Sequence, residues 1–332
     1  MQKIAESPLS LEPGDHYGNG GVVTKLEAQI AQLLGKEAAV FMPSGTMAQQ
    51  IALRIYADES GINQVAFHPT CHLHIYEQMA YSELHHLEGV LLGNPEALFT
   101  LQDLESVQGP LSSLLIELPQ RVIGGQLPTW EELTAICDYA RAKEIKLHMD
   151  GARLWECAPF YNRTYAEIAA PFESVYVSFY KILGALPGAA LAGPASLIEK
   201  ARIWQRRHGG NLHQQSPAAI SAILGMEHHL PLIPRYVEKA REIASILSKF
   251  EEIEVIPKTP PTNMMHLKFG IPKEALEKAV IQIAEEDKVF FPLFLSDDCR
   301  TELTVGEAVL DFNANATEYL FSKLLNSNRI IN

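Results

Sequence analysis

The 332-residue sequence has few cysteines and no segment with the composition of a membrane-spanning helix. Its four cysteines are scattered without a C-x-x-C pair, which predicts reduced and unreactive thiols in a cytoplasmic protein. The longest apolar run, residues 182–198, is interrupted by glycine and proline and therefore predicts strand and turn. Residues 1–18 contain no apolar stretch of the kind that a secretory signal needs.

Basic charge is also scarce. Twenty-seven lysines and arginines stand against forty acidic residues, which gives a formal net charge of −13. Because no run of basic residues offsets this charge, we expect neither nucleic acid nor an anionic membrane surface as a partner. The hydrophobic fraction of 47% is enough for a large core, and the length favours more than one domain.

Short apolar runs alternate with helical patterns over the first two thirds of the chain. Strands are predicted at "EAAVFM", "NQVAFH", "LSSLLIEL", "IKLHMD", "SVYVSF" and "GAALAG", with helices between several of them. Nearly continuous apolar strands that alternate with helices are typical of an α/β fold with a mostly parallel sheet. We therefore predict a large domain over residues 15–251, preceded by an N-terminal arm over residues 1–14.

The pattern changes toward the C-terminus. Two long helices are predicted in "SPAAISAILGMEHH" and "IPRYVEKAREIASILSKF", followed by short strands and two more helices. This mixture predicts a smaller α+β domain over residues 252–332.

Lys181 stands alone as a charge in an apolar stretch. It is the only charged residue between Glu173 and Glu199, and it follows a predicted buried strand. A lysine that loses water becomes a neutral amine, the form that condenses with a carbonyl group to give a Schiff base. A buried stem with its ammonium group in water explains the same pattern equally well.

Two further groups of residues lie where predicted strands end, which is where ligands bind in parallel sheets. Ser44, Gly45 and Thr46 join a strand to a helix and could hold a phosphate, although this stretch alone fits an ordinary helix N-cap better. Asp150 could bind a cofactor's protonated ring nitrogen, and Arg153 a carboxylate. An internal ion pair between these two residues is the alternative.

The histidines in "TCHLHIYE" complete the set of candidates. His72 or His74 could stack on an aromatic cofactor or act as a base, although each alone fits a half-buried helix position better. No histidine spacing in the chain matches a metal site, so we predict no metal ion.

Together these groups are the parts of a pyridoxal 5′-phosphate (PLP) site. The chain resembles the threonine aldolase/β-eliminating lyase family of fold type I PLP enzymes through "GKEAAVFMPSGTM", "HMDGARLWE" and "KILGALPGAALAGP". The resemblance runs over nearly the whole length. It implies the aspartate aminotransferase-like large domain, with an active site completed by a second subunit of a homodimer or homotetramer.

The resemblance also implies residue roles. Lys181 carries the Schiff base, Asp150 pairs with the pyridine nitrogen, and His72 lies over the ring. The phosphate lies at Ser44, Gly45 and Thr46. Arg153, which also lies beside the cofactor, and Arg300 bind the carboxylate of a small amino-acid substrate.

Three segments depart from the family pattern. Tyr180 and Ile182 flank the lysine in place of Ser and Gly, "IELPQRVIGG" begins near Glu117 in place of an "ENTHN" segment, and residues 208–214 have no arginine in register. We predict a PLP-dependent aldolase that cleaves a β-hydroxy-α-amino acid of the threonine or allo-threonine type to glycine and an aldehyde. The alternative is a different β-eliminating lyase or an aminotransferase-like activity on the same fold.

Overall fold

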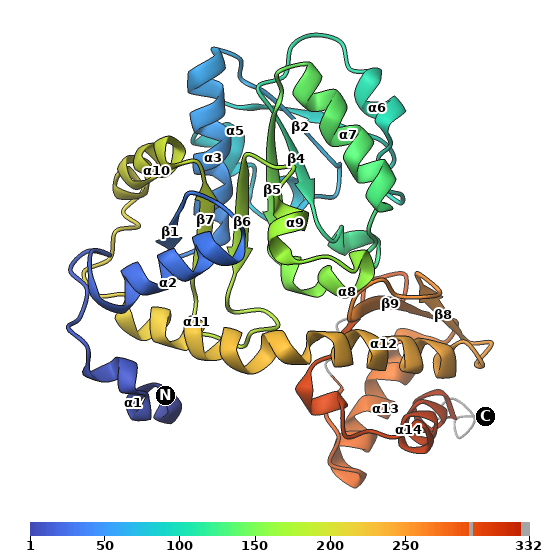
Figure 1. Ribbon diagram of the computed structural model, residues 1–332. Coiled ribbons are helices and arrows are strands. Elements are labelled where there is room, and N and C mark those ends of the chain that lie inside the picture. The colour runs from blue at the N-terminus through green and yellow to red at the C-terminus, as the bar shows by residue number, and fades with distance from the viewer. Residues whose placement is uncertain (292–294, 327–332) are drawn as a thin grey trace. The chain divides into compact units, whose positions relative to one another are not determined.

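The computed structural model describes residues 1–291 and 295–326 and forms two compact units (Figure 1). The first unit contains Met1–Arg121 and Leu127–Pro231, and the second contains Val122–Gln126 and the chain from Leu232 onward. The second unit thus begins about one helix earlier than the residue 252 boundary predicted from the sequence. The helix concerned, α12 (Ile233–Leu247), buries apolar side chains among those of the second unit.

The first unit is built on a seven-stranded sheet. All neighbouring pairs are parallel except the two that involve β7, which runs antiparallel to both of its neighbours. In spatial order the strands are β1 (Ala38–Met42), β7 (Ala189–Gly193), β6 (Ser174–Ser178), β5 (Lys146–Gly151), β4 (Ser113–Glu117), β2 (Gln64–Phe67) and β3 (Glu88–Leu91). This arrangement confirms the predicted α/β fold with a mostly parallel sheet.

Helices lie on both sides of this sheet (Figure 1). The longer ones are α2 (Gly21–Leu33), α3 (Gly45–Ser60), α7 (Trp130–Ala142), α10 (Ala195–Arg207) and α11 (Ser216–His229). The short ones are α1 (Gln2–Glu6), η1 (Pro8–Leu11), α4 (His72–Ile75), α5 (Ala80–Glu83), α6 (Leu101–Glu105), η2 (Arg121–Ile123), η3 (Leu154–Glu156), α8 (Ala158–Tyr161), α9 (Tyr165–Ala169) and η4 (Leu230–Leu232). Apolar residues of α3 and α10 pack with Val40, Tyr176 and Leu191 in one buried cluster, which places both helices on the same face of the sheet.

The second unit has its own small sheet and core. Strands β8 (Ile253–Ile256), β9 (Met264–Phe269) and β10 (Arg300–Thr304) form an antiparallel sheet in the order β10-β9-β8. It packs with α12, α13 (Lys273–Glu286) and α14 (Ala314–Asn326), and η5 (Glu307–Val309) follows β10. The short segment Val122–Gln126 joins this unit through two glycines: a Cβ on Gly124 would lie 2.3 Å from the Ile256 carbonyl oxygen, and one on Gly125 would lie 2.4 Å from the Met264 side chain.

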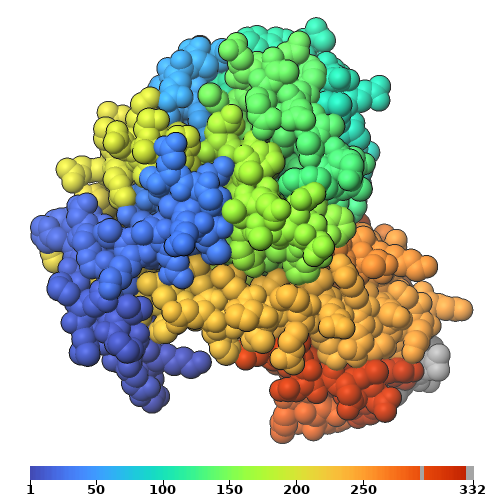
Figure 2. Space-filling model, viewed as in Figure 1, coloured from blue at the N-terminus to red at the C-terminus, as the bar shows by residue number. Residues whose placement is uncertain are grey.

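The N-terminal segment is fastened to the start of α11, and in the space-filling view it covers one corner of the first unit (Figure 2). The buried carboxylate of Asp15 accepts hydrogen bonds from the backbone amides of Gln215 (2.8 Å) and Ser216 (2.7 Å) and from the Ser216 hydroxyl (2.6 Å). These donors include amides at the beginning of a helix, which have no acceptor inside the helix itself. Asp15 therefore fixes the N-terminal segment and the first turn of α11 together.

All four cysteines have free thiols. Cys71, Cys137 and Cys157 are buried, and burial raises the pKa of each of these thiols. Since the thiolate is the reactive form, three of the four are unreactive, as the sequence predicts. Within the described part of the chain, no helix combines the length and the apolar composition that a bilayer crossing requires.

Helix α11 supports the turn that carries Lys181. The amide of Leu186 donates a hydrogen bond to the Ser221 hydroxyl (3.0 Å), and a Cβ on Gly225 would lie only 2.5 Å from the carbonyl oxygen of Leu183. The absence of a side chain at Gly225 therefore lets the backbone of this turn rest directly on the helix.

We expect Gly225→Ala to lower the free energy of unfolding, because a methyl group pressed against backbone overpacks the core at a cost of about 1–3 kcal/mol. This cost exceeds the gain of roughly 1 kcal/mol that alanine brings to a helix interior. Urea unfolding followed by circular dichroism measures the difference. Gly270→Ala is the control, because a Cβ there would meet the Glu252 backbone at an ordinary 3.7 Å. A Gly225→Ala protein as stable as the wild type would contradict the packing argument.

Candidate active site

Three polar side chains form a row across neighbouring strands, with Glu117 and Asp150 at or near the carboxyl ends of theirs. Glu117 on β4 pairs in register with Asp150 on β5, and Asp150 pairs with Tyr176 on β6. Residues paired in this way project from the same face of a sheet. All three are buried, and they share the face that α3 covers.

Burial governs the charge state of the two carboxyl groups. It raises the pKa of Asp150, against the opposing effect of the nearby Lys181 ammonium, a hydrogen bond from the Ala152 amide (3.0 Å) and the nearby His72. Burial and the neighbouring Asp150 raise the pKa of Glu117 to about 7. Two carboxylates in one low-dielectric site repel each other, so the pair favours a bound proton or a nearby cation.

Lys181 lies beside these carboxyl groups. It follows β6 in a tight turn in which the Gly184 amide donates to the Lys181 carbonyl oxygen at 2.9 Å. Burial, and after it the nearby Arg153 guanidinium, lowers the pKa of the amine, while Asp150 and Glu117 act in the opposite direction. The amine is thus partly dehydrated and within electrostatic range of both carboxyl groups, which favours the Schiff-base interpretation over a fully solvated ammonium group.

The turn with Ser44, Gly45 and Thr46 begins α3 at the same edge of the sheet. The Ser44 hydroxyl accepts a hydrogen bond from the Met47 amide at 3.3 Å. Ser44 is therefore the N-cap of α3, which is the simpler of the two interpretations of this stretch. The amides of Gly45 and Thr46 occupy the first turn, where a helix offers no internal acceptor and its dipole favours an anion. A Cβ on Gly45 would lie 2.0 Å from the Tyr176 hydroxyl oxygen, so glycine is required here because the phenol packs against the turn.

His72 is held at two points. Its backbone amide donates to Glu117 Oε2 at 2.9 Å, and its ring Nδ1 lies 3.0 Å from Glu77 Oε1. The nearby His72 also opposes the raised pKa of Asp150, which places the ring within electrostatic range of that carboxyl group. His74, by contrast, lies with its Nδ1 3.1 Å from the Tyr81 hydroxyl and packs beside Phe67.

The two predicted carboxylate ligands belong to different units. Arg153 is half-buried just after β5, and its charge acts on Lys181, so it belongs to the candidate site. Arg300 begins β10 in the second unit, where its Nε lies 3.5 Å from Asp298 Oδ2. The role of Arg300 therefore stays a prediction from the sequence.

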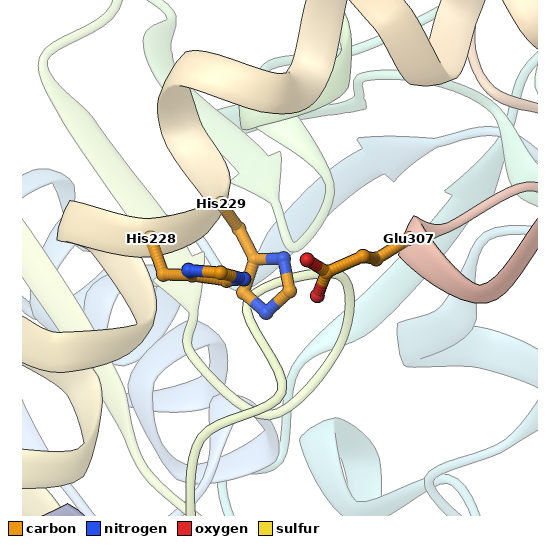
Figure 3. A group of neighbouring side chains, drawn as sticks. All are labelled: His228, His229 and Glu307. Carbon is orange, nitrogen blue, oxygen red and sulfur yellow. The ribbon is translucent and has the colours of Figure 1, made fainter. Parts of the chain in front are cut away.

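Histidines outside this site have local roles. The buried His68 ring has Nε2 2.8 Å from the Ala97 carbonyl oxygen, while its Nδ1 accepts a hydrogen bond from the Thr70 amide at 3.1 Å. Both nitrogens of His68 are therefore used in holding a loop. His228 and His229 end α11, and their ring centroids are 4.6 Å apart. Figure 3 shows both rings together with Glu307, which belongs to the second unit.

Three residues of the site were not predicted as functional. Glu117 carried the same sequence signal as Asp150, because each is a carboxylate at the end of a buried strand. Glu77 lies five residues after His72, and only the fold shows that it reaches the ring. Tyr176 gave no signal, because a tyrosine inside an apolar strand is an ordinary core residue.

A second buried group of polar side chains, connected by hydrogen bonds, consists of Tyr56, Ser174 and His148. The Tyr56 hydroxyl donates to Ser174 Oγ (2.7 Å), and Ser174 Oγ lies 2.7 Å from His148 Nδ1. Ser174 Oγ thus links the Tyr56 hydroxyl to the His148 ring. Burial lowers the pKa of His148 to about 3.

Several known proteins are similar to this chain. A family model described as beta-eliminating lyase matches residues 3–269. Low-specificity L-threonine aldolase 1 of Arabidopsis thaliana is 28% identical over 265 residues, which are 76% of this chain and 73% of the relative. A crystal structure from Listeria monocytogenes with the provisional name L-allo-threonine aldolase is 42% identical, with a TM-score of 0.94 over 98% of this chain and 92% of that one. Threonine aldolase of Leishmania major, 19% identical, shares the fold with a TM-score of 0.74 over 100% of this chain and 96% of its own.

The buried imidazole ring of His148 makes the free energy of unfolding depend on pH over a defined range. Between pH 6.5 and about 3 the unfolded chain binds a proton at His148 that the native state does not, so stability falls as the pH falls. The expected contribution is about 1.4 kcal/mol per pH unit in the middle of this window. We expect His148→Gln to remove it, which makes the free energy of unfolding less steep between pH 6 and 4. Urea titrations of both proteins at several pH values measure the two slopes; equal slopes would contradict the assignment.

Proposed function

Because this chain belongs to the beta-eliminating lyase family and has the fold of fold type I PLP-dependent enzymes, we propose that it is a PLP-dependent aldolase. Its proposed substrate is a β-hydroxy-α-amino acid of the threonine or allo-threonine type, which it cleaves to glycine and an aldehyde. The names of the relatives favour this reaction over other chemistry on the same fold.

The residues at the candidate site fit PLP. The first-turn amides of Gly45 and Thr46 and the dipole of α3 suit its phosphate, and the buried carboxylate of Asp150 suits a protonated ring nitrogen. The partly dehydrated amine of Lys181 suits its aldehyde. When bound, PLP supplies an electron-accepting ring that stabilises negative charge at the α-carbon of the substrate.

The side chains of this protein then have distinct tasks. Arg153 binds the substrate carboxylate through its planar guanidinium group, with Arg300 as the second carboxylate ligand on the strength of the sequence resemblance. This contact orients the amino acid and so decides which bond at the α-carbon is aligned for cleavage. The ring of His72 takes the proton of the β-hydroxyl group at Nε2, while its Nδ1 stays on Glu77.

The observation that carries the proposal is that Lys181 and Asp150 lie within electrostatic range of each other. An amine with a lowered pKa beside a buried carboxylate is uncommon in a purely structural role, because each charge costs free energy to bury. Within a known catalytic family, the simplest explanation is that the site is kept ready for a cofactor that uses both groups.

We also propose that the protein acts in the cytoplasm as a homodimer or homotetramer on a small amino-acid substrate, without nucleic acid or membrane partners. The free, buried thiols and the acidic net charge of −13 support the compartment and the absence of polyanionic partners.

The test is to purify the wild type and Lys181→Ala in the presence of PLP and to record visible absorbance and products. We expect the wild type to carry the absorbance of lysine-bound PLP and to release glycine and acetaldehyde from threonine or allo-threonine. Lys181→Ala should lose both, while Lys200→Ala, which changes an exposed lysine paired with Glu59, should keep both. Removing the amine removes the group that condenses with the aldehyde.

Reactions with serine and cysteine as substrates distinguish the aldolase from the alternative, a β-eliminating lyase. Pyruvate and ammonia from these substrates, without glycine from any β-hydroxy amino acid, would show a β-eliminating lyase in place of the aldolase. A wild type that stays colourless with added PLP would contradict the cofactor assignment itself.

A further inference from the structure

Glu77 is a buried carboxylate with three hydrogen-bond donors around it. Its side chain is only 1% exposed. Oε1 lies 3.0 Å from His72 Nδ1 and accepts from Gln49 Nε2 at 3.3 Å, and Oε2 accepts from Gln50 Nε2 at 3.1 Å. The carboxylate is therefore fixed in orientation from two elements, α3 and the segment that begins with α4.

Among the residues that the structure describes, His72 is the one ionisable group within hydrogen-bond distance of Glu77. The two glutamine amides are neutral, so they hold the carboxylate oxygens without neutralising their charge. A buried carboxylate without a permanent cation is costly unless a nearby group can share its charge. Only the imidazole ring can do so at this position.

This contact fixes which nitrogen of His72 carries the proton. A carboxylate accepts hydrogen bonds, so Nδ1 must be the protonated nitrogen, and in the neutral ring Nε2 keeps the lone pair. The backbone amide of His72 is bound to Glu117 at 2.9 Å, which fixes the backbone from which the ring extends toward Glu77. No described residue other than Glu77 forms a hydrogen bond with the ring nitrogens of His72.

We propose that Glu77 is a positioning residue that holds His72 in its Nδ1–H tautomer, so that Nε2 is the nitrogen available to receive a proton. The proposal rests on the function above only in taking His72 as the group that accepts the β-hydroxyl proton. On accepting it, the ring becomes an imidazolium whose Nδ1–H still donates to the ionised Glu77. The negative charge then faces the new positive charge in a buried setting, where such an interaction is strong.

The contacts of Glu77 also suggest how to separate this role from a structural one. Glu77→Gln removes the charge and leaves three donors competing for one amide oxygen. Gln50→Met keeps the volume and removes only a donor that does not touch His72. Glu83→Gln removes an exposed negative charge from the nearby α5 and controls for net charge.

The experiment measures the His72 tautomer by ¹⁵N NMR of the full-length protein labelled at histidine, assigned with His72→Gln, and measures kcat and KM with threonine. We expect the wild type in the Nδ1–H tautomer and Glu77→Gln shifted away from it, with kcat reduced on the order of 10²-fold and a KM changed much less. Gln50→Met should lower the melting temperature but keep the wild-type tautomer, and Glu83→Gln should resemble the wild type in all measurements.

A wild-type His72 in the Nε2–H tautomer would overturn the proposal, even if Glu77→Gln did not fold. The proposal would also be overturned if Gln50→Met and Glu77→Gln shifted the His72 tautomer and lowered kcat to the same extent. The role of Glu77 would then be structural anchoring. If the wild type had no aldolase activity while Glu77→Gln still changed the tautomer, the proposed function would fail and the positioning role would stand.

Discussion

The site depends on a lysine amine and a carboxylate that are held together out of water. Asp150 is fixed by the pairing of β5 with β4 and β6, and Lys181 by a tight turn after β6 that rests on α11. Burial lowers the pKa of the amine and raises that of the carboxyl group, so each is pushed toward its neutral form. Their mutual attraction opposes this shift, so the charge state of each group depends on that of the other.

Glu117 links these two groups to His72. Its two oxygens accept the backbone amides of His72 and of Arg121, the latter at 3.1 Å, so it fixes the segments that follow two different strands. The same carboxyl group lies beside Asp150, and its pKa is raised to about 7. Glu117 therefore both anchors the backbone of His72 and changes the electrostatic environment of Lys181 and Asp150. In this way the position of His72 is coupled to the charge of the lysine–aspartate pair.

Local sequence signals predicted most of the fold and half of the site. Lys181, Asp150 and the Ser44 turn were found because each marks the end of a buried strand, a feature visible within ten residues. Strand β3 was missed because it lies at the edge of the sheet and is largely exposed, so its sequence lacks a continuous apolar run. Glu77 and Tyr176 were missed as site residues because their partners lie on other elements, and strand register and helix packing are set by the whole fold.

Two of the departures from the family pattern adjoin the row of Glu117, Asp150 and Tyr176: the altered segment "IELPQRVIGG" includes Glu117, and the Tyr180 side chain is hydrogen-bonded to Tyr176. Tyr180, which precedes the lysine, is 42% exposed. In the altered segment after α10, Gly210 packs closely against α3, since a Cβ there would lie 2.3 Å from the Met47 sulfur. Gln205 also binds the carbonyl oxygens of Phe41 (2.7 Å) and Gly210 (3.3 Å), which ties this segment to the end of β1. Contacts with Met47 and with the end of β1 therefore fix the backbone path of this segment beside the turn that begins α3.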